Sequence, residues 1–365
     1  MSKRAKILIA IITIVIIISA LYVAKNRADN TLSQEPIKLG FVLPLTGNLA
    51  FVGEGARNAA KLALSTVGDT KHSYQLVFED DAFNPKNTVT AVHKLIDIDG
   101  VTSIGTIFSN AGNVTSPITE QSKVIHFGIA SDPAIAIGDY NYIHWTPPYE
   151  EVRLLISELS SHNVKNIAVL GAQIQGVVAV ENELQKQIEG TDITIVHEEN
   201  FNFGTTDFKT VLQKTNEKNP DMYVLFAFSP ELEILTKQMR ALGITTPITG
   251  IESFEYSNEP ELFNNLWYIN AGDPTSEFSK KYKDTYRAEA PVAAANVYDI
   301  VKLMVYATEH ANSSNPTTSD IQKELDRVQN FPGALGNLSI DSDGFVFSKA
   351  VVRVMKDGVP MTISK

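Results

Sequence analysis

The stretch IKLGFVLPLTGNLAFVGEGARNAAKLALSTV, residues 37–67, contains the unit from which the fold is built. Its first part, Ile37–Leu43, is an almost continuous apolar run of strand length, and Glu54–Val67 has the length and composition of a helix. A continuous apolar run is typical of a strand that is buried on both faces, whereas a strand with one solvated face alternates. The stretch therefore predicts a strand–helix unit of a parallel sheet.

The same alternation continues along the chain. Further runs of strand length are Tyr74–Glu79, Ser103–Phe108, Val124–Phe127, Asn166–Leu170, Ile193–His197 and Met222–Phe226. The helix-length segments between them are Pro85–Asp97, Glu150–Ser161, Val177–Ile188, Phe208–Glu217 and Glu231–Leu242. Such alternation predicts an α/β fold with parallel sheets.

The alternation starts twice, which predicts two α/β units. The first runs from residue 37 to about residue 145, and the second begins at about Tyr149, after the break Thr146-Pro147-Pro148. A length of 365 residues also suits two domains. Near the end, residues 337–355 predict a hairpin around the turn Asp341-Ser342-Asp343-Gly344.

Charge and cysteine content exclude several classes of protein. The net charge is −11, and five basic residues precede the first acidic residue, Asp29. The remainder carries 26 basic and 42 acidic residues, a balance of −16. Nucleic acid is not an expected partner, because phosphate binding needs a basic face. The chain has no cysteine, which excludes disulfides, thiolate metal sites and a lipid-modified N-terminal cysteine.

The N-terminus predicts export. Ile7–Ala24 is apolar apart from Thr13 and Ser19, and it follows a basic tip. Residues 1–24 form either a signal peptide, which has a shorter apolar core and a small-residue cleavage site, or an uncleaved anchor. Both possible cleavage sites have a bulky residue at position −3, which favours the anchor. The basic tip then stays in the cytoplasm and the body lies outside, behind a linker at residues 25–36.

No motif predicts catalysis, a metal or a cofactor. Gly53-Glu54-Gly55 is half of a dinucleotide fingerprint, with Asn58 where the third glycine belongs. Neither a phosphate-binding loop nor a nucleophile elbow is present. The seven histidines lack metal-binding spacing, and Asp341–Gly344 lacks the later ligands of a calcium loop. An enzyme is therefore not expected.

Three loops that follow strands carry small hydrogen-bonding residues. They are Ser109-Asn110-Ala111-Gly112, Gly128-Ile129-Ala130-Ser131-Asp132 and Gly250-Ile251-Glu252-Ser253. In open α/β sheets, ligands bind beyond the carboxyl ends of the strands. The first two loops suit a carboxylate and the third suits an ammonium group. The alternative for each is a helix cap, which is common in such sequences.

Three longer segments resemble those of a known family. They are IKLGFVLPLTGNLAFVGEGARNAAKLAL (37–64), LVFEDDAFNPKNTVTAVHKLI (76–96) and FNFGTTDFKTVLQKTNEKNPDMYVLFAFSPELEILTKQMRALGI (201–244). Their order and landmarks resemble the type I periplasmic binding proteins, specifically the leucine/isoleucine/valine-binding family of ABC-transporter receptors. The resemblance covers residues 37–359.

The resemblance implies two Rossmann-like lobes with parallel sheets, joined by a hinge of three crossings near Thr146, Gly272 and Gly336. Lobe 1 would comprise residues 37–145 and 274–335, and lobe 2 residues 146–273 and 336–365. Such proteins close around a small solute and present the closed form to a membrane permease with its ATPase.

The resemblance also implies binding residues. Ser109, Ala130 and Ser131 would hold a ligand carboxylate, and Glu252 would meet the ammonium group. Three further positions depart from the family pattern: Gln175 stands in place of a tyrosine, Phe228 or Ser229 in place of another, and Val52, beside Phe51, in place of an aromatic residue. The implied ligand is an amino acid or close analogue, with an amide, urea or aromatic acid as the alternative. A membrane-anchored sensor with the same cleft is the second functional possibility.

Overall fold

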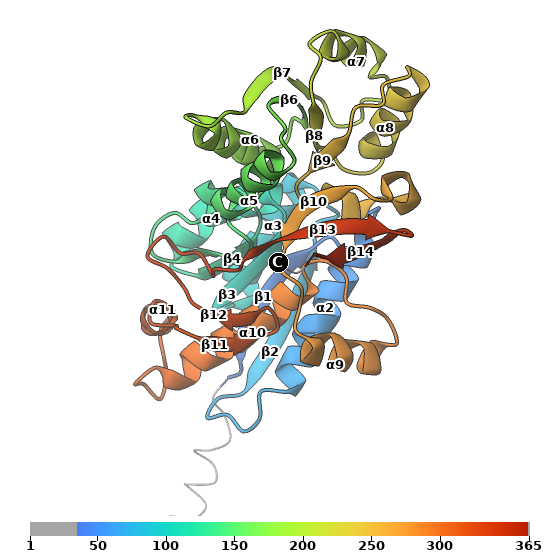
Figure 1. Cartoon of the computed structure of the whole chain (residues 1–365). Coiled ribbons are helices and arrows are strands. Elements are labelled where there is room, and N and C mark those ends of the chain that lie inside the picture. Colours follow the sequence, from blue (N-terminus) through green and yellow to red (C-terminus); the bar gives the residue numbers. More distant parts are fainter. Residues whose placement is uncertain (1–34, 364–365) are drawn as a thin grey trace, which may run out of the picture.

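The first lobe contains a five-stranded parallel sheet (Figure 1). The computed structural model describes residues 35–363. The strands are β1 (Ile37–Leu43), β2 (Tyr74–Asp80), β3 (Ser103–Ile107), β4 (Ile125–Ile129) and β5 (Asn141–Ile143), in the order β2-β1-β3-β4-β5. The order reverses direction between β1 and β3, and ligands bind at such a switch point in open α/β sheets.

The first lobe draws its helices from both ends of the chain. The N-terminal part supplies α2 (Ala50–Ser65), α3 (Pro85–Lys94) with the π-helical turn η1 (Leu95–Asp99), and α4 (Ser109–Ser122). The C-terminal part supplies α9 (Ser276–Tyr286), α10 (Ala294–His310) and α11 (Thr318–Leu325). In Figure 1, α10 lies beside α2, and both contribute to one hydrophobic core.

The second lobe repeats the arrangement with the strand order β7-β6-β8-β9. Its parallel strands are β6 (Asn166–Ala172), β7 (Thr194–Phe201), β8 (Met222–Phe226) and β9 (Ile248–Gly250). Its helices are α5 (Pro148–Ser161), α6 (Gln175–Ile188), α7 (Lys209–Asn216) and α8 (Glu231–Ala241). These strands pair in parallel, and two hydrophobic clusters contain them. The predicted α/β fold with parallel sheets is therefore confirmed.

An antiparallel sheet adjoins the second lobe, in the order β10-β13-β14. It consists of β10 (Trp267–Ala271), β13 (Ala350–Lys356) and β14 (Val359–Thr362), and a parallel bridge between Ile251 and Ile269 links it to β9. The remaining short elements are η2 (Pro133–Ile135), η3 (Ser253–Tyr256), η4 (Pro260–Phe263), β11 (Phe331–Gly333) and β12 (Gly336–Leu338).

The last part of the chain differs from the sequence prediction. The turn at Asp341–Gly344 forms, with the Asp341 amide donating to the Phe345 carbonyl at 3.0 Å. However, β12 pairs with β11, and β13 pairs with β10 and β14. Leu338, Ile340, Phe345 and Val346 pack in the core of the first lobe, so the chain remains with the first lobe beyond residue 336. A bridge between Ile143 and Phe345 extends the first sheet and holds this segment there.

The glycines of Gly53-Glu54-Gly55 have a packing role. The sequence predicted that the helix starts at Glu54, but α2 already begins at Ala50, so both glycines lie inside the helix. A Cβ on Gly53 would collide with the Pro44 carbonyl, and one on Gly55 would collide with the Pro291 ring. Close approach of α2 to these two segments therefore explains the half-motif without a nucleotide.

The N-terminal prediction lies outside the described residues. Between residues 35 and 363, no helix combines the length and the apolar character needed to cross a bilayer. The apolar run Ile7–Ala24 precedes this range, so a signal peptide or anchor remains a prediction.

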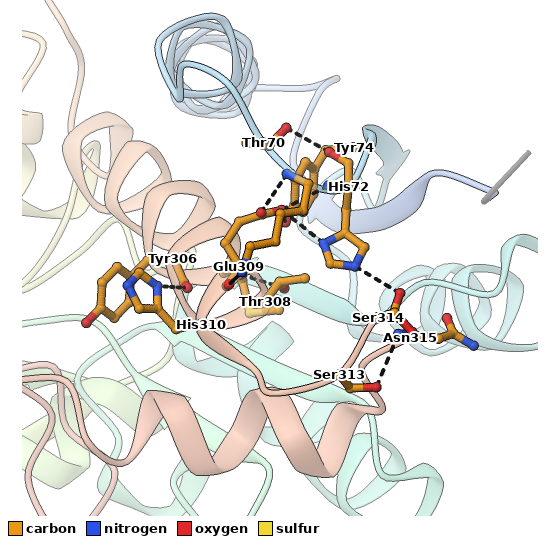
Figure 2. Close-up of polar contacts among 12 residues, drawn as sticks. Thr70, His72, Tyr74, Tyr306, Thr308, Glu309, His310, Ser313, Ser314 and Asn315 are labelled. Atoms are coloured by element: carbon orange, nitrogen blue, oxygen red, sulfur yellow. Dashed lines mark hydrogen bonds and ion pairs between the residues drawn. The ribbon is translucent and has the colours of Figure 1, made fainter. Parts of the chain in front are cut away.

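A polar cluster ties α10 to the amino end of β2, at the edge of the first sheet opposite the strand-end loops (Figure 2). Glu309 accepts hydrogen bonds from the Tyr74 hydroxyl at 2.6 Å, the Lys71 amide at 2.7 Å, and the His72 amide and ring at 3.2 and 3.1 Å. The other His72 ring nitrogen lies 3.3 Å from the Ser314 carbonyl. This network fastens the C-terminal end of α10 to the sheet.

Candidate functional site

Two predicted residues of the first lobe lie at neighbouring strand ends. Ser109 opens α4 directly after β3, and Ser131 follows β4. The two strands pair in register, and the Phe108 amide donates to the Ile129 carbonyl at 2.9 Å. Ser109 and Ala130 are buried. The first lobe therefore brings Ser109, Ala130 and Ser131 together at one edge of its sheet.

The start of α4 has an unusual backbone. Phe108 occupies the N-cap position with φ 74° and ψ 149°, and no side chain caps the helix. A non-glycine residue in this region is strained and is held by its surroundings. The Phe83 ring packs edge-on against Phe108, at 5.2 Å between centroids. The expected helix cap is thus absent, and the positive end of the α4 dipole lies beside Ser109.

The second lobe touches the first at the start of α6. A Cβ on Gly176 would lie 2.9 Å from the Ser109 hydroxyl and 3.9 Å from the Ser131 Cβ. The Asn113 side-chain amide of α4 donates to Gln175 at 2.8 Å and to Asp132 at 2.7 Å. The structure therefore has the two lobes closed against each other at the predicted site.

Glu252 lies on the side of the second lobe that contacts the first lobe. It follows β9 with φ 60°, and its amide donates to the Ile269 carbonyl at 2.8 Å. Its carboxyl group accepts a hydrogen bond from the Trp145 indole and is within hydrogen-bonding reach of Ser131 and Glu151. Trp145 belongs to the core of the first lobe at the point where the chain leaves it, so Glu252 of the second lobe contacts the first lobe through both Trp145 and Ser131.

The environment raises the pKa values of both glutamates. Burial and the charge of Glu252 raise the pKa of Glu151 well above its ordinary value. Burial also raises the pKa of Glu252, although hydrogen bonds from Glu151, Trp145 and Ser131 oppose this shift. Glu252 keeps some exposed surface, but its carboxyl group is enclosed enough for burial to be the largest cause. The negative end of the site is therefore an environment that favours a proton or a cation.

The other predicted side chains do not gather around Glu252 in the same way. Val52 is fully buried in the core of the first lobe. Phe228 is partly buried against the core of the second lobe. Phe51, the neighbour of Val52, is exposed. Gln175 contacts the first lobe, because its side-chain oxygen accepts a hydrogen bond from Asn113.

A hollow opens between the lobes next to the Asn113–Gln175 bridge. Its volume is about 520 Å³, which is within the usual range for small-molecule sites. The first lobe lines it with residues 132–134, and the second with residues 173–175 and one face of α6. Because residues 132 and 175 also bridge to Asn113, this hollow adjoins the site on its open side.

Sequence reasoning missed Trp145, Glu151 and Asn113. Glu150 and Glu151 both lie in the first turn of α5, yet Glu151 is buried and Glu150 pairs with Arg153 at 2.7 Å. Helical periodicity can indicate which of two neighbours faces inward, but it does not show what the inward residue meets. Asn113 lies one turn into α4, which the loop-based search did not include.

The described residues, 35–363, do not indicate a metal site. They contain no group of three or more histidine and acidic side chains that could hold a metal ion. His126 is buried between Thr106 and Asn141, at 2.8 and 3.1 Å. Burial lowers its pKa to about 4, so it is neutral at ordinary pH. It serves as a buried structural side chain.

Comparison with known proteins identifies the family of this chain. The sequence model of the family described as "Periplasmic binding protein" matches residues 36–358. The chain belongs to this family, as the resemblance in its sequence indicated.

Individual relatives are distant. The leucine-, isoleucine-, valine-, threonine- and alanine-binding protein of Pseudomonas aeruginosa is 22% identical over 335 residues, covering 87% of this chain and 89% of the relative. A leucine binding protein from Thermotoga maritima superimposes with a TM-score of 0.80 at 22% identity, covering 90% of this chain and 98% of that one. A solute binding protein from Rhodopseudomonas palustris in complex with benzoate gives a TM-score of 0.78 at 15% identity, covering 90% and 96%. The type I fold is thus shared by proteins whose ligands differ.

Proposed function

We propose that this protein is an exported solute-binding receptor of an ABC importer, and that it binds an amino acid or close analogue between its lobes. The observation that carries the proposal is the convergence of Ser109 and Ser131 from one lobe with Gly176 and Glu252 from the other. Family membership and relatives that are binding proteins support it. The receptor acts outside the cytoplasm, held there by residues 7–24 if they are not cleaved, and its partners are a permease and an ATPase.

In this proposal, the two ends of the cleft bind different groups of the ligand. The hydroxyls of Ser109 and Ser131, with the amides near Ala130 and the start of α4, receive a carboxylate. Glu252 receives the ammonium group, because an ionised carboxylate accepts charge-assisted hydrogen bonds. Gln175, with Val52 and Phe228 further away, borders the ligand side chain.

The proposal implies that ligand binding and lobe closure are one event. The hydrogen bond from Asn113 to Gln175 is a contact between the lobes, so opening of the lobes would break it. A ligand that touches both lobes stabilises this state by its differential affinity. A permease can then distinguish loaded from empty receptor by the surface that closure creates.

A thermal-shift panel of amino acids, amides and aromatic acids tests the function. A ligand at 100 times its dissociation constant stabilises the folded protein by about 2.7 kcal/mol. Glu252→Gln removes a charge-assisted bond worth about 1.5–3 kcal/mol, so affinity for amines falls roughly ten- to a hundredfold. Glu259→Gln, which alters a surface pair with Lys237, is the matched control. The assignment fails if ligands without an amine are the only ones that bind.

A further inference from the structure

Glu151 is a buried carboxyl group without a donor. Its exposed fraction is 0%, and apart from the neighbouring carboxyl group of Glu252, its carboxylate oxygens have no hydrogen-bond partner among the described residues. Burying an unpaired polar group is costly, and a charged one costs more. In proteins, such groups are normally paired with a cation, a donor or water. An unpartnered carboxyl group at this position therefore points to a partner that the protein chain does not supply.

The carboxyl group of Glu151 faces that of Glu252, within hydrogen-bonding reach. Both are acceptors when ionised, so a hydrogen bond between them requires that one of the two carries a proton. Trp145 donates to Glu252, and Ser131 reaches the same carboxyl group from the first lobe. The unpartnered group thus points into the interlobe site described above.

The two carboxylates have more acceptor capacity than a single ammonium group can use. An ionised carboxylate offers about four lone-pair sites, and an ammonium group has three N–H donors. Two adjacent buried carboxylates cannot both ionise without a compensating cation, because like charges at this range raise each other's pKa. The raised pKa of Glu151 agrees with this reasoning.

We propose that Glu151 and Glu252 together form one cation-binding site, and that the ligand is an amino acid or analogue with an additional basic group and a net positive charge. This inference rests on the proposed function and names its ligand class. A second ammonium or guanidinium group supplies the donors and the charge that Glu151 lacks, and a guanidinium group has five N–H donors in a fixed planar arrangement.

Proton exchange follows from the same geometry. In the empty protein one proton occupies the pair, so Glu151 is neutral and donates to the ionised Glu252. When the cationic ligand binds, Glu151 ionises and its proton leaves to solvent. The net positive charge of the ligand thus replaces the charge of the released proton. Both carboxyl groups of the pair are ionised only while the ligand is bound.

The surrounding charged groups have partners of their own. The charge of Glu255 acts on Glu252, and Glu255 is paired with Arg353 of β13, which also contacts Asp273 at 2.7 Å. On α6, which packs against α5, Lys186 contacts Glu183 and Glu181 accepts from Asn200. On β10, the Tyr268 hydroxyl donates to Glu255. None of these groups forms an ion pair with Glu151.

Isothermal titration calorimetry of the exported body tests the inference with five probes. They are arginine and agmatine, which are net cationic, leucine as a zwitterion, acetamide as a neutral amide, and benzoate as an anion. We expect the cationic probes to bind most tightly. Glu151→Gln keeps the shape of the side chain and removes its charge, so it weakens the cationic probes roughly a hundredfold and leaves leucine unchanged or bound more tightly.

The matched control is Glu150→Gln, one residue away on the same helix, whose carboxylate pairs with Arg153 at the surface. This variant leaves all five affinities unchanged. Titrations repeated in buffers with different ionisation enthalpies measure the number of protons that are released when a ligand binds. Wild type releases about one proton per cationic ligand, and Glu151→Gln releases none. Because the proton count is measured on wild type, the test stands even if the variant folds poorly.

The outcomes separate the two proposals. If leucine binds most tightly and no proton is released, the cation inference is overturned while the receptor proposal survives. If acetamide or benzoate alone binds, the amino-acid assignment fails as well. If cationic probes bind equally well to wild type and Glu151→Gln, Glu151 has no part in recognition and the inference fails. If none of the five probes binds and no small molecule co-purifies with the protein, both proposals are contradicted.

Discussion

Two glutamates in different regions of the molecule have opposite surroundings. Glu309, at the amino end of the first sheet, accepts four hydrogen bonds from Lys71, His72 and Tyr74 (Figure 2). Glu151, between the lobes, has no donor in the described chain. Although burial alone would raise the pKa of Glu309, the hydrogen bonds outweigh it and hold the pKa below its ordinary value. The pKa of Glu151 is raised.

The difference separates a stabilising region from a binding region. A carboxylate whose acceptors are all used stabilises the fold, because protonating it or removing it leaves donors unpaired. A carboxyl group with unused acceptors costs stability in the empty protein, and this cost is recovered when a ligand binds. Substitutions near Glu309 should therefore change unfolding and spare binding, whereas substitutions near Glu151 should do the reverse.

The largest effect is expected at Glu309. Glu309→Gln replaces the anion and turns an amide donor toward the donors that surround it. We expect the free energy of unfolding to fall by about 2–4 kcal/mol, given that hydrogen bonds to charged groups contribute about 1.5–3 kcal/mol each. Chemical denaturation measures this loss. Glu277→Gln, in an exposed pair with Lys281, should change stability by less than about 0.5 kcal/mol. Equal losses in both variants would remove the distinction between the regions.

The pH dependence of stability should have opposite signs at the two sites. The folded-state pKa of Glu309 lies below the unfolded value of about 4.3. Its stabilisation is therefore present above pH 4.3 and is lost as the pH falls through the folded pKa. The folded-state pKa of Glu151 lies above the unfolded value, so its contribution becomes destabilising as the pH rises above about 4.3.

Melting temperatures measured from pH 8 down to about pH 2.5 cover both changes, because the Glu309 contribution is lost only below about pH 4.3. Relative to wild type, Glu151→Gln should gain stability as the pH rises, by about 1.4 kcal/mol for each unit of pKa shift. Glu309→Gln should approach wild type as the pH falls. Parallel curves for the two variants would show that the two carboxyl groups share one kind of environment.

A smaller effect is expected where the lobes touch. Gly176→Ala places a methyl group about 2.9 Å from the Ser109 hydroxyl. The hydroxyl must rotate or the lobes must stay slightly open, so we expect ligand affinity to fall about tenfold, or 1.4 kcal/mol. The free energy of unfolding should hardly change, because each lobe keeps its own core. Calorimetry and denaturation on the same sample separate these quantities, and a large loss of stability with unchanged affinity would contradict the assignment.

The smallest effect is expected from Asn113→Ala, which removes the bridge to Gln175. The variant also removes the hydrogen bond to Asp132, but Asp132 belongs to the same lobe as Asn113, so only the neutral bond to Gln175, worth about 0.5–1.5 kcal/mol, acts between the lobes. Its loss should reduce affinity only a few fold and increase the population of open receptor. Small-angle scattering without ligand should then give a larger radius of gyration than wild type. An unchanged radius together with unchanged affinity would mean that this contact does not contribute to closure.

The sequence supported the fold more fully than the site. Continuous apolar strands alternating with helices predicted parallel sheets, because sheets covered on both faces need such strands. It placed Ser109, Ala130, Ser131 and Glu252 at strand ends, where the chain reverses direction. It predicted the turn at Asp341–Gly344, across which Ile340 and Val346 form an antiparallel bridge. It did not predict that β12 pairs with β11 and that β13 pairs with β10 and β14, because these pairings depend on which strand edges lie nearby in the folded chain.

By itself, the sequence determined the α/β class, the two-part alternation and the strand-end loops, since these follow from local hydrophobic patterns and turn residues. Tertiary structure alone decided that Glu151 rather than Glu150 faces Glu252, that Trp145 donates to the same carboxyl group, and that Gly176 closes on Ser109. Each of these contacts joins segments tens of residues apart. Their energies depend on burial and on distance in space, and local sequence patterns encode neither.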